Sequence, residues 1–137
     1  ILYKIFGTNI MIIKIFNILI SICTSLQIYC ISKKIFDEKA ARISSLLYAI
    51  WPAQIMFTSV AASEHIYLLL LLLSFQLFLQ VLGEITNKKR YVYSIGTGIA
   101  IALTQFIRPT AIMLLPILLF YLFVFMHYNN FKAQSII

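Results

Sequence analysis

The chain has 137 residues, of which 62% are hydrophobic and only 11% are charged, and its mean hydropathy is +0.97. A soluble domain is nearer half apolar and about one quarter charged, so too few polar residues remain here to cover a soluble surface. The formal net charge of +7 does not indicate nucleic-acid binding, because most basic residues lie in short gaps between apolar runs. The composition therefore predicts an integral membrane protein.

Five apolar stretches approach the roughly 17–25 residues that a bilayer-spanning helix needs. In chain order they are Asn9–Ile31, Ala40–Val60, Glu64–Leu82, Tyr91–Ile107 and Thr110–Met126. Because the gaps between them are short, consecutive helices should run antiparallel. The predicted fold is an all-α, polytopic transmembrane helix bundle with about five spans.

The gaps between the stretches predict the orientation of the bundle. SKKIFDEKAAR (residues 32–42) and GEITNKKR (residues 83–90) carry seven of the eleven basic residues, which places both in the cytoplasm. Alternation of the helices then places FTSVAASEH (residues 57–65) and FIRPT (residues 106–110) on the extracytoplasmic side. Asp37, Glu38 and Glu84 mix with Lys and Arg in the cytoplasmic loops. Glu64 and Arg108 are the two charges that share the outer face.

Glu64 stands in VAASEHIYLLLLLLSF (residues 60–75), directly before a run of leucines. One interpretation is structural: Ser63 caps the helix, and a carboxylate in the first turn complements the positive helix end. The other is functional: the carboxylate borders a membrane-embedded cavity and binds a metal, a cationic group or a polar substrate. The residues alone leave both interpretations open, and His65 beside it is more often incidental at an interface.

Arg108 stands in TQFIRPTAIMLLP (residues 104–116), where Pro109 interrupts the helix. Its side chain either snorkels to the headgroups or binds a phosphate through the planar fork of its guanidinium. A helix break at membrane depth is tolerated mainly where it is buried in protein or lines a watery cavity, which favours phosphate binding. We also expect Trp51 and Pro52 to kink the second span, and Ser94, Gly98 and Ala102 to form a small-residue packing face.

Several motifs, taken in order, resemble a known class of enzymes. They are LYKIFGTN (residues 2–9), KIFNILIS (residues 14–21), the basic loop at residues 32–42, the Trp-Pro pair, the Ser-Glu-His step and the Arg-Pro-Thr run that ends at Pro116. This order is similar to that of the GT-C class of membrane glycosyltransferases. The resemblance is strongest to the bacterial relatives of dolichyl-phosphate-mannose protein mannosyltransferases and to the lipid A aminoarabinose transferases.

The resemblance implies a GT-C type enzyme that takes a sugar from a polyprenyl-phosphate carrier and transfers it, with inversion, to an extracytoplasmic acceptor. Glu64 matches the family's second acidic position, near the donor phosphate and any bound divalent metal, and is our candidate catalytic residue. Arg108 and His65 are candidate substrate-binding residues, although His65 departs from the family's usual Pro. The family's first-loop acid, the base for the acceptor hydroxyl, would precede Ile1.

We therefore expect residues 1–137 to be part of one transmembrane glycosyltransferase domain whose N-terminal span, first outer loop and C-terminal part are missing, and which is inactive alone. The expected partners are the lipid bilayer, a polyprenyl-phosphate-linked sugar and a lipid, glycan or protein acceptor, with no nucleic acid. The expected location is a bacterial plasma membrane. The alternative is a non-enzymatic transporter or flippase for lipid-linked saccharides, which would use Arg108 but would need no catalytic acid.

Overall fold

The computed structural model describes residues 10–59, 63–83 and 86–134, and these residues form helices with no strand. The elements are α2 (Ile10–Ile35), α3 (Glu38–Ile50), α4 (Pro52–Ser59), α5 (Glu64–Gly83), α6 (Asn87–Ile107), the 3-10 helix η1 (Pro109–Met113) and α7 (Leu114–Gln134). The prediction of an all-α fold is confirmed. The LYKIFGTN segment, Val60 and Glu84 lie outside the described residues.

Two of the described helices are long and apolar enough to cross a membrane. They are Met11–Ile35 within α2, where an 18-residue window has a mean hydropathy of 1.8, and α5, where such a window has a mean hydropathy of 2.2. Pro109–Val124 is apolar but shorter. Large apolar side chains such as Leu19 and Phe120 are more than half exposed, as expected for helices whose outer surfaces face lipid. The fold is thus a membrane helix bundle, and the number of five spans stays a prediction.

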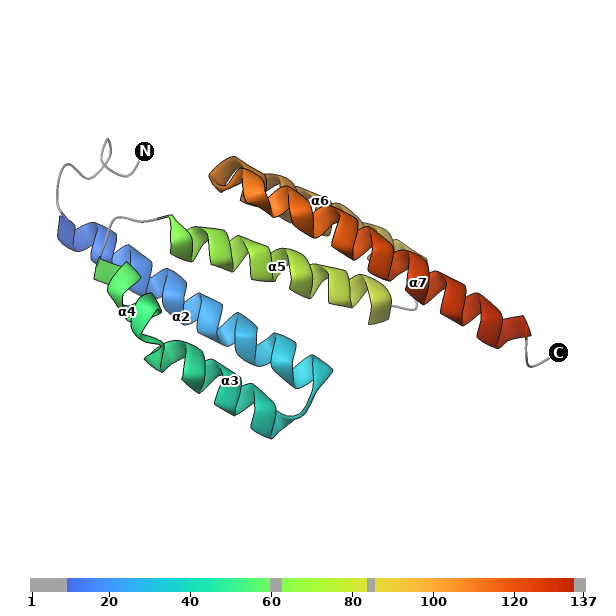
Figure 1. Cartoon of the computed structure of the whole chain (residues 1–137), viewed down its shortest axis with the longest axis horizontal. Coiled ribbons are helices and arrows are strands. Elements are labelled where there is room, and N and C mark those ends of the chain that lie inside the picture. The colour runs from blue at the N-terminus through green and yellow to red at the C-terminus, as the bar shows by residue number, and fades with distance from the viewer. Residues whose placement is uncertain (1–9, 60–62, 84–85, 135–137) are drawn as a thin grey trace.

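The helices pack side by side, with α2 between α3 and α5, and with α5 against α6 (Figure 1). A core of Phe78, Ile101 and Leu118 joins α5, α6 and α7, and the rings of Phe78 and Tyr121 meet edge to face with centroids 6.0 Å apart. A Cβ at Gly96 would lie 3.4 Å from Leu77 Cδ1, so glycine lets α6 approach α5 closely. This packing fixes where α5 and α6 end relative to each other.

The second predicted span is divided at Trp51-Pro52, where the predicted kink is confirmed. Pro52 has no backbone N–H, and it disfavours helical backbone at the residue before it. Trp51 accordingly has φ −66° and ψ 118°, and its N–H donates to the Tyr48 carbonyl at 3.2 Å. The span divides into α3 and the eight-residue α4, which begins at Pro52, a favoured first helical position.

The predicted packing face of α6 is wrong for the described residues. Ser94, Gly98 and Ala102 are exposed, and a Cβ added at Gly98 would meet nothing within 4 Å. The buried face consists instead of small and β-branched residues: Thr97, Ala100, Ile101 and Thr104. A four-residue spacing of small side chains therefore did not identify the buried face, because α6 carries small residues on more than one side.

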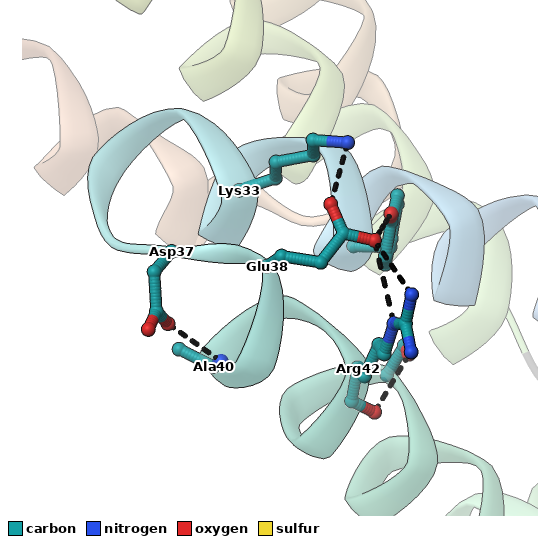
Figure 2. A network of polar contacts seen from close by, with 7 residues as sticks. Lys33, Asp37, Glu38, Ala40 and Arg42 are labelled. Carbon is teal, nitrogen blue, oxygen red and sulfur yellow. Dashed lines mark hydrogen bonds and ion pairs between the residues drawn. The ribbon is translucent and has the colours of Figure 1, made fainter.

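A charged network joins α2 to α3 at one end of the bundle (Figure 2). The Glu38 carboxylate lies 2.6 Å from Lys33 Nζ and 3.2 Å from Arg42 Nη2, and it accepts a 2.7 Å hydrogen bond from Tyr29. The Lys33 hydrogen bond, followed by that of Tyr29, lowers the pKa of Glu38 to about 2. Asp37 caps α3 by accepting from Ala40 N at 2.8 Å. The prediction that these acids mix with basic residues is confirmed.

Candidate functional site

Glu64 is the first residue of α5, where the helix backbone stabilises a carboxylate. The N–H of Tyr67 donates to the Ser63 carbonyl at 3.0 Å, which closes the first turn. A negative charge in this turn interacts favourably with the positive end of the helix dipole. The Glu64 side chain is 27% exposed, so it is partly shielded but still open to a ligand.

Arg108 lies at the junction of α6 and η1, where Pro109 removes it from the helix. Its backbone is extended, with φ −143° and ψ 118°, as expected for a residue that precedes proline. The junction is nevertheless ordered by backbone hydrogen bonds: Arg108 N donates to Thr104 O at 3.0 Å, and Ala111 N donates to Arg108 O at 3.2 Å. The chain therefore turns at Arg108 without leaving its backbone groups unpaired.

The structure brings Glu64 and Arg108 into direct contact, although they are 44 positions apart in sequence. Arg108 Nη2 donates to Glu64 Oε1, and the two side chains form an ion pair. The Arg108 side chain remains 44% exposed. The start of α5 and the α6–η1 junction lie at one end of the bundle, and the end of α2, the start of α3, the end of α5 and the start of α6 lie at the other (Figure 1). The two charges that the sequence grouped on one face are thus in contact.

Tyr67 is the residue of this site that the sequence analysis missed. The Arg108 Cζ atom lies 5.5 Å from the centroid of the Tyr67 ring, within the range of a cation–π interaction. Tyr67 follows Glu64 by three positions, so both side chains project from the same face of α5. The three-residue spacing from Glu64 could have indicated Tyr67 from the sequence, but only if Arg108 were already known to lie against this face of α5.

His65 lies beside Glu64 but inside the bundle. Its side chain is completely buried, and neither ring nitrogen forms a hydrogen bond of ordinary geometry with the described residues. The backbone of Phe57 in α4 lies near the ring. A substrate would reach this imidazole only after the surrounding helices rearrange, so its assignment as a substrate-binding residue stays a prediction.

The family resemblance implies a divalent metal at Glu64, which would need further ligands around this carboxylate. Mg²⁺ and Ca²⁺ take several oxygen ligands, commonly from more than one carboxylate. The described residues contain no group of three or more His, Cys, Asp or Glu that would surround an ion, and Glu64 already contacts a guanidinium. The described residues therefore do not fit a metal by themselves.

A family model described as dolichyl-phosphate-mannose-protein mannosyltransferase matches residues 1–136, almost the whole chain. No curated protein and no solved structure matches. The chain therefore belongs to the dolichyl-phosphate-mannose-protein mannosyltransferase family, whose members are membrane-embedded glycosyltransferases that use a lipid-linked sugar donor.

Proposed function

We propose that this member of the family, in its complete form, transfers a sugar from a polyprenyl-phosphate carrier to an acceptor on the extracytoplasmic side of a bacterial plasma membrane. The observation that carries the proposal is the contact between Glu64 and Arg108 at the end of the bundle opposite the basic loops. Basic loops favour the cytoplasm, so the opposite end is the outer one. The lipid, glycan or protein acceptor would reach the donor there.

The chemistry requires a cation at this position. Transfer forms a bond from the acceptor oxygen to the sugar's anomeric carbon and breaks the bond from that carbon to the phosphate oxygen. The departing phosphate carries the electron pair and must be stabilised where its charge develops. The guanidinium of Arg108 has five N–H donors, its contact with Glu64 uses one nitrogen, and its side chain is 44% exposed. Arg108 is therefore suited to bind the phosphate bidentately.

Glu64 and His65 would have different roles. Glu64 would orient Arg108 before the donor binds and contact the donor at the reaction centre, whereas His65 would contact substrate only after the first turn of α5 rearranges. The acceptor hydroxyl also needs a general base. We place that base in a part of the complete protein outside the described residues.

Release of the carrier phosphate separates this proposal from lipid-linked saccharide transport. In detergent micelles no membrane separates two compartments, so a flippase leaves its lipid-linked saccharide intact, whereas a transferase liberates polyprenyl phosphate. The complete protein should release polyprenyl phosphate from polyprenyl-phosphate mannose in an acceptor-dependent manner, and Arg108→Ala should greatly reduce this release. Lys88→Ala, which removes one exposed positive charge from the opposite end, is the control and should release normally. Release that is absent from wild type, or unaffected by Arg108→Ala, would overturn the proposal.

A further inference from the structure

Arg108 is held by two side chains of α5 that have different chemical properties. Glu64 contacts an edge of the guanidinium through Oε1, and the ring of Tyr67 lies 5.5 Å from the guanidinium carbon. The two are separated by three positions on α5, so they meet Arg108 from one helix face. The site thus consists of a cation, a competing anion and a neutral aromatic surface.

An incoming phosphate affects the two partners differently. Phosphate and Glu64 are both anions, so they compete for the N–H donors of Arg108 and repel each other. The ring of Tyr67 has no net charge, and its negative π-face attracts the guanidinium whether or not an anion is bound. The contact with Glu64 therefore weakens when phosphate binds, while the contact with Tyr67 is retained.

Retention of one partner matters because Arg108 would otherwise be poorly fixed. Its backbone lies at a helix junction, and its long side chain is 44% exposed. A flexible side chain loses conformational freedom when it binds a ligand, and preorganisation reduces that loss. A surface that stays in contact with the guanidinium keeps its donors aimed at the phosphate after Glu64 releases them.

We propose that Tyr67 is a positioning residue for the donor: its ring holds the guanidinium of Arg108 in place while the donor phosphate displaces Glu64. This inference rests on the proposed function, since it assumes that Arg108 binds the phosphate. Tyr67 touches Arg108 and not the reacting atoms. The aromatic face carries the effect, so Phe replaces Tyr, and an aliphatic side chain of similar size does not.

The test measures initial rates of transfer by the complete protein in nanodiscs, at a series of concentrations of polyprenyl-phosphate mannose. Tyr67→Leu should raise the KM for the donor roughly two- to fivefold, the effect of losing one partly exposed cation–π contact, and should leave the KM for the acceptor unchanged. Tyr67→Phe should match wild type. Tyr93→Leu, which makes the same change near the opposite end of α6, should also match wild type.

Two further measurements test the role of Tyr67 even if Tyr67→Leu folds poorly. Phenylalanines with one, two and three ring fluorines, introduced at position 67, keep nearly the same shape but progressively weaken the negative π-face, so the donor KM should rise with each fluorine. In an Arg108→Ala background, Tyr67→Leu should have no additional effect on donor KM. A donor KM that is insensitive to fluorination, or an equal effect of Tyr67→Leu in both backgrounds, would overturn the positioning role.

The donor KM of Arg108→Ala distinguishes a failure of the role of Tyr67 from a failure of the proposed phosphate site. If Arg108→Ala leaves donor KM at the wild-type value, the phosphate site itself is wrong and the inference about Tyr67 is refuted with it. If Arg108→Ala raises donor KM but the fluorinated series does not, the phosphate site stands and only the role of Tyr67 is refuted.

Discussion

Replacement of Arg108 by Lys separates phosphate binding from simple anchoring at the membrane interface. Lys has a similar reach and charge, so it can snorkel to the headgroups as Arg does. Its ammonium is a point charge, however, and does not reproduce the planar pair of N–H donors that binds a phosphate bidentately. We expect Arg108→Lys in the complete protein to insert and accumulate normally but to bind the donor more weakly.

The size of this effect follows from the exposure of Arg108. One hydrogen bond to a charged group contributes about 1.5–3 kcal/mol. Because 44% of the Arg108 side chain is exposed, solvent screens the interaction and the lower end of that range applies. A loss of about 1.5 kcal/mol corresponds to a roughly tenfold rise in donor KM. Arg108→Ala should be worse, because it removes the counter-charge of both the phosphate and Glu64.

The assay is transfer from polyprenyl-phosphate mannose in nanodiscs, with the amount of inserted protein equalised between variants. Arg42→Lys is a matched control, since Arg42 also pairs with a glutamate, Glu38, in α3, which begins at the opposite end of the bundle (Figure 1). The control should retain the wild-type donor KM. If Arg108→Lys and Arg108→Ala both retain the wild-type donor KM as well, Arg108 is an interface anchor and its binding of the phosphate is refuted.

Three other predictions concern the two ends of the bundle. Glu64→Gln should insert normally but lose transfer by orders of magnitude; near-normal transfer would leave Glu64 with only a structural role. In a protein without its native cysteines, single cysteines at Ser63 and Thr110, but not at Asn87, should react with a membrane-impermeant thiol reagent, and the reverse pattern would contradict the orientation. The lowered pKa of Glu38 means that its contribution to stability is present above its ordinary pKa of 4.5 and is lost as pH falls through about 2. The protection of amide hydrogens at the start of α3, measured relative to their intrinsic exchange rates at each pH, should therefore fall across this interval in wild type but not in Glu38→Gln.

The grouping of Glu64 with Arg108 followed from the sequence because charge is informative in an apolar chain. Seven basic residues fall in two gaps, and alternation of short-looped helices leaves few arrangements for the remaining charges. That reasoning grouped Glu64 with Arg108 on one face, and the structure brings them into contact. It did not predict the contact itself, because a shared face does not specify which helices are neighbours. The packing of α5 against α6 supplies that information.

The packing faces could not be predicted, for a reason specific to membranes. In a soluble helix the buried stripe is apolar and the exposed stripe is polar, so periodicity identifies the core. In α5 both the lipid-facing and the buried sides are apolar, and the buried residues include His65 and Ser74. The type of a side chain in α5 therefore carries little information about whether it faces the bundle or the lipid. The same limitation hid Tyr67 among the other apolar and aromatic residues of the helix.

The proposed phosphate site gives the ion pair a role that its contribution to stability does not. Glu64 is the one charged residue of α5, a helix whose composition already suits the bilayer. A charge near the apolar layer is costly, and pairing with Arg108 offsets that cost without making the pair better than two well-packed apolar side chains. As a negative charge at the positive end of the helix dipole, Glu64 contributes only about 0.3–1 kcal/mol, and Asp would serve as well. In a partly exposed pair, however, an external anion such as the donor phosphate can replace the Glu64 carboxylate at Arg108. Arg108 then keeps its contact with Tyr67 and does not lose all its partners in the exchange.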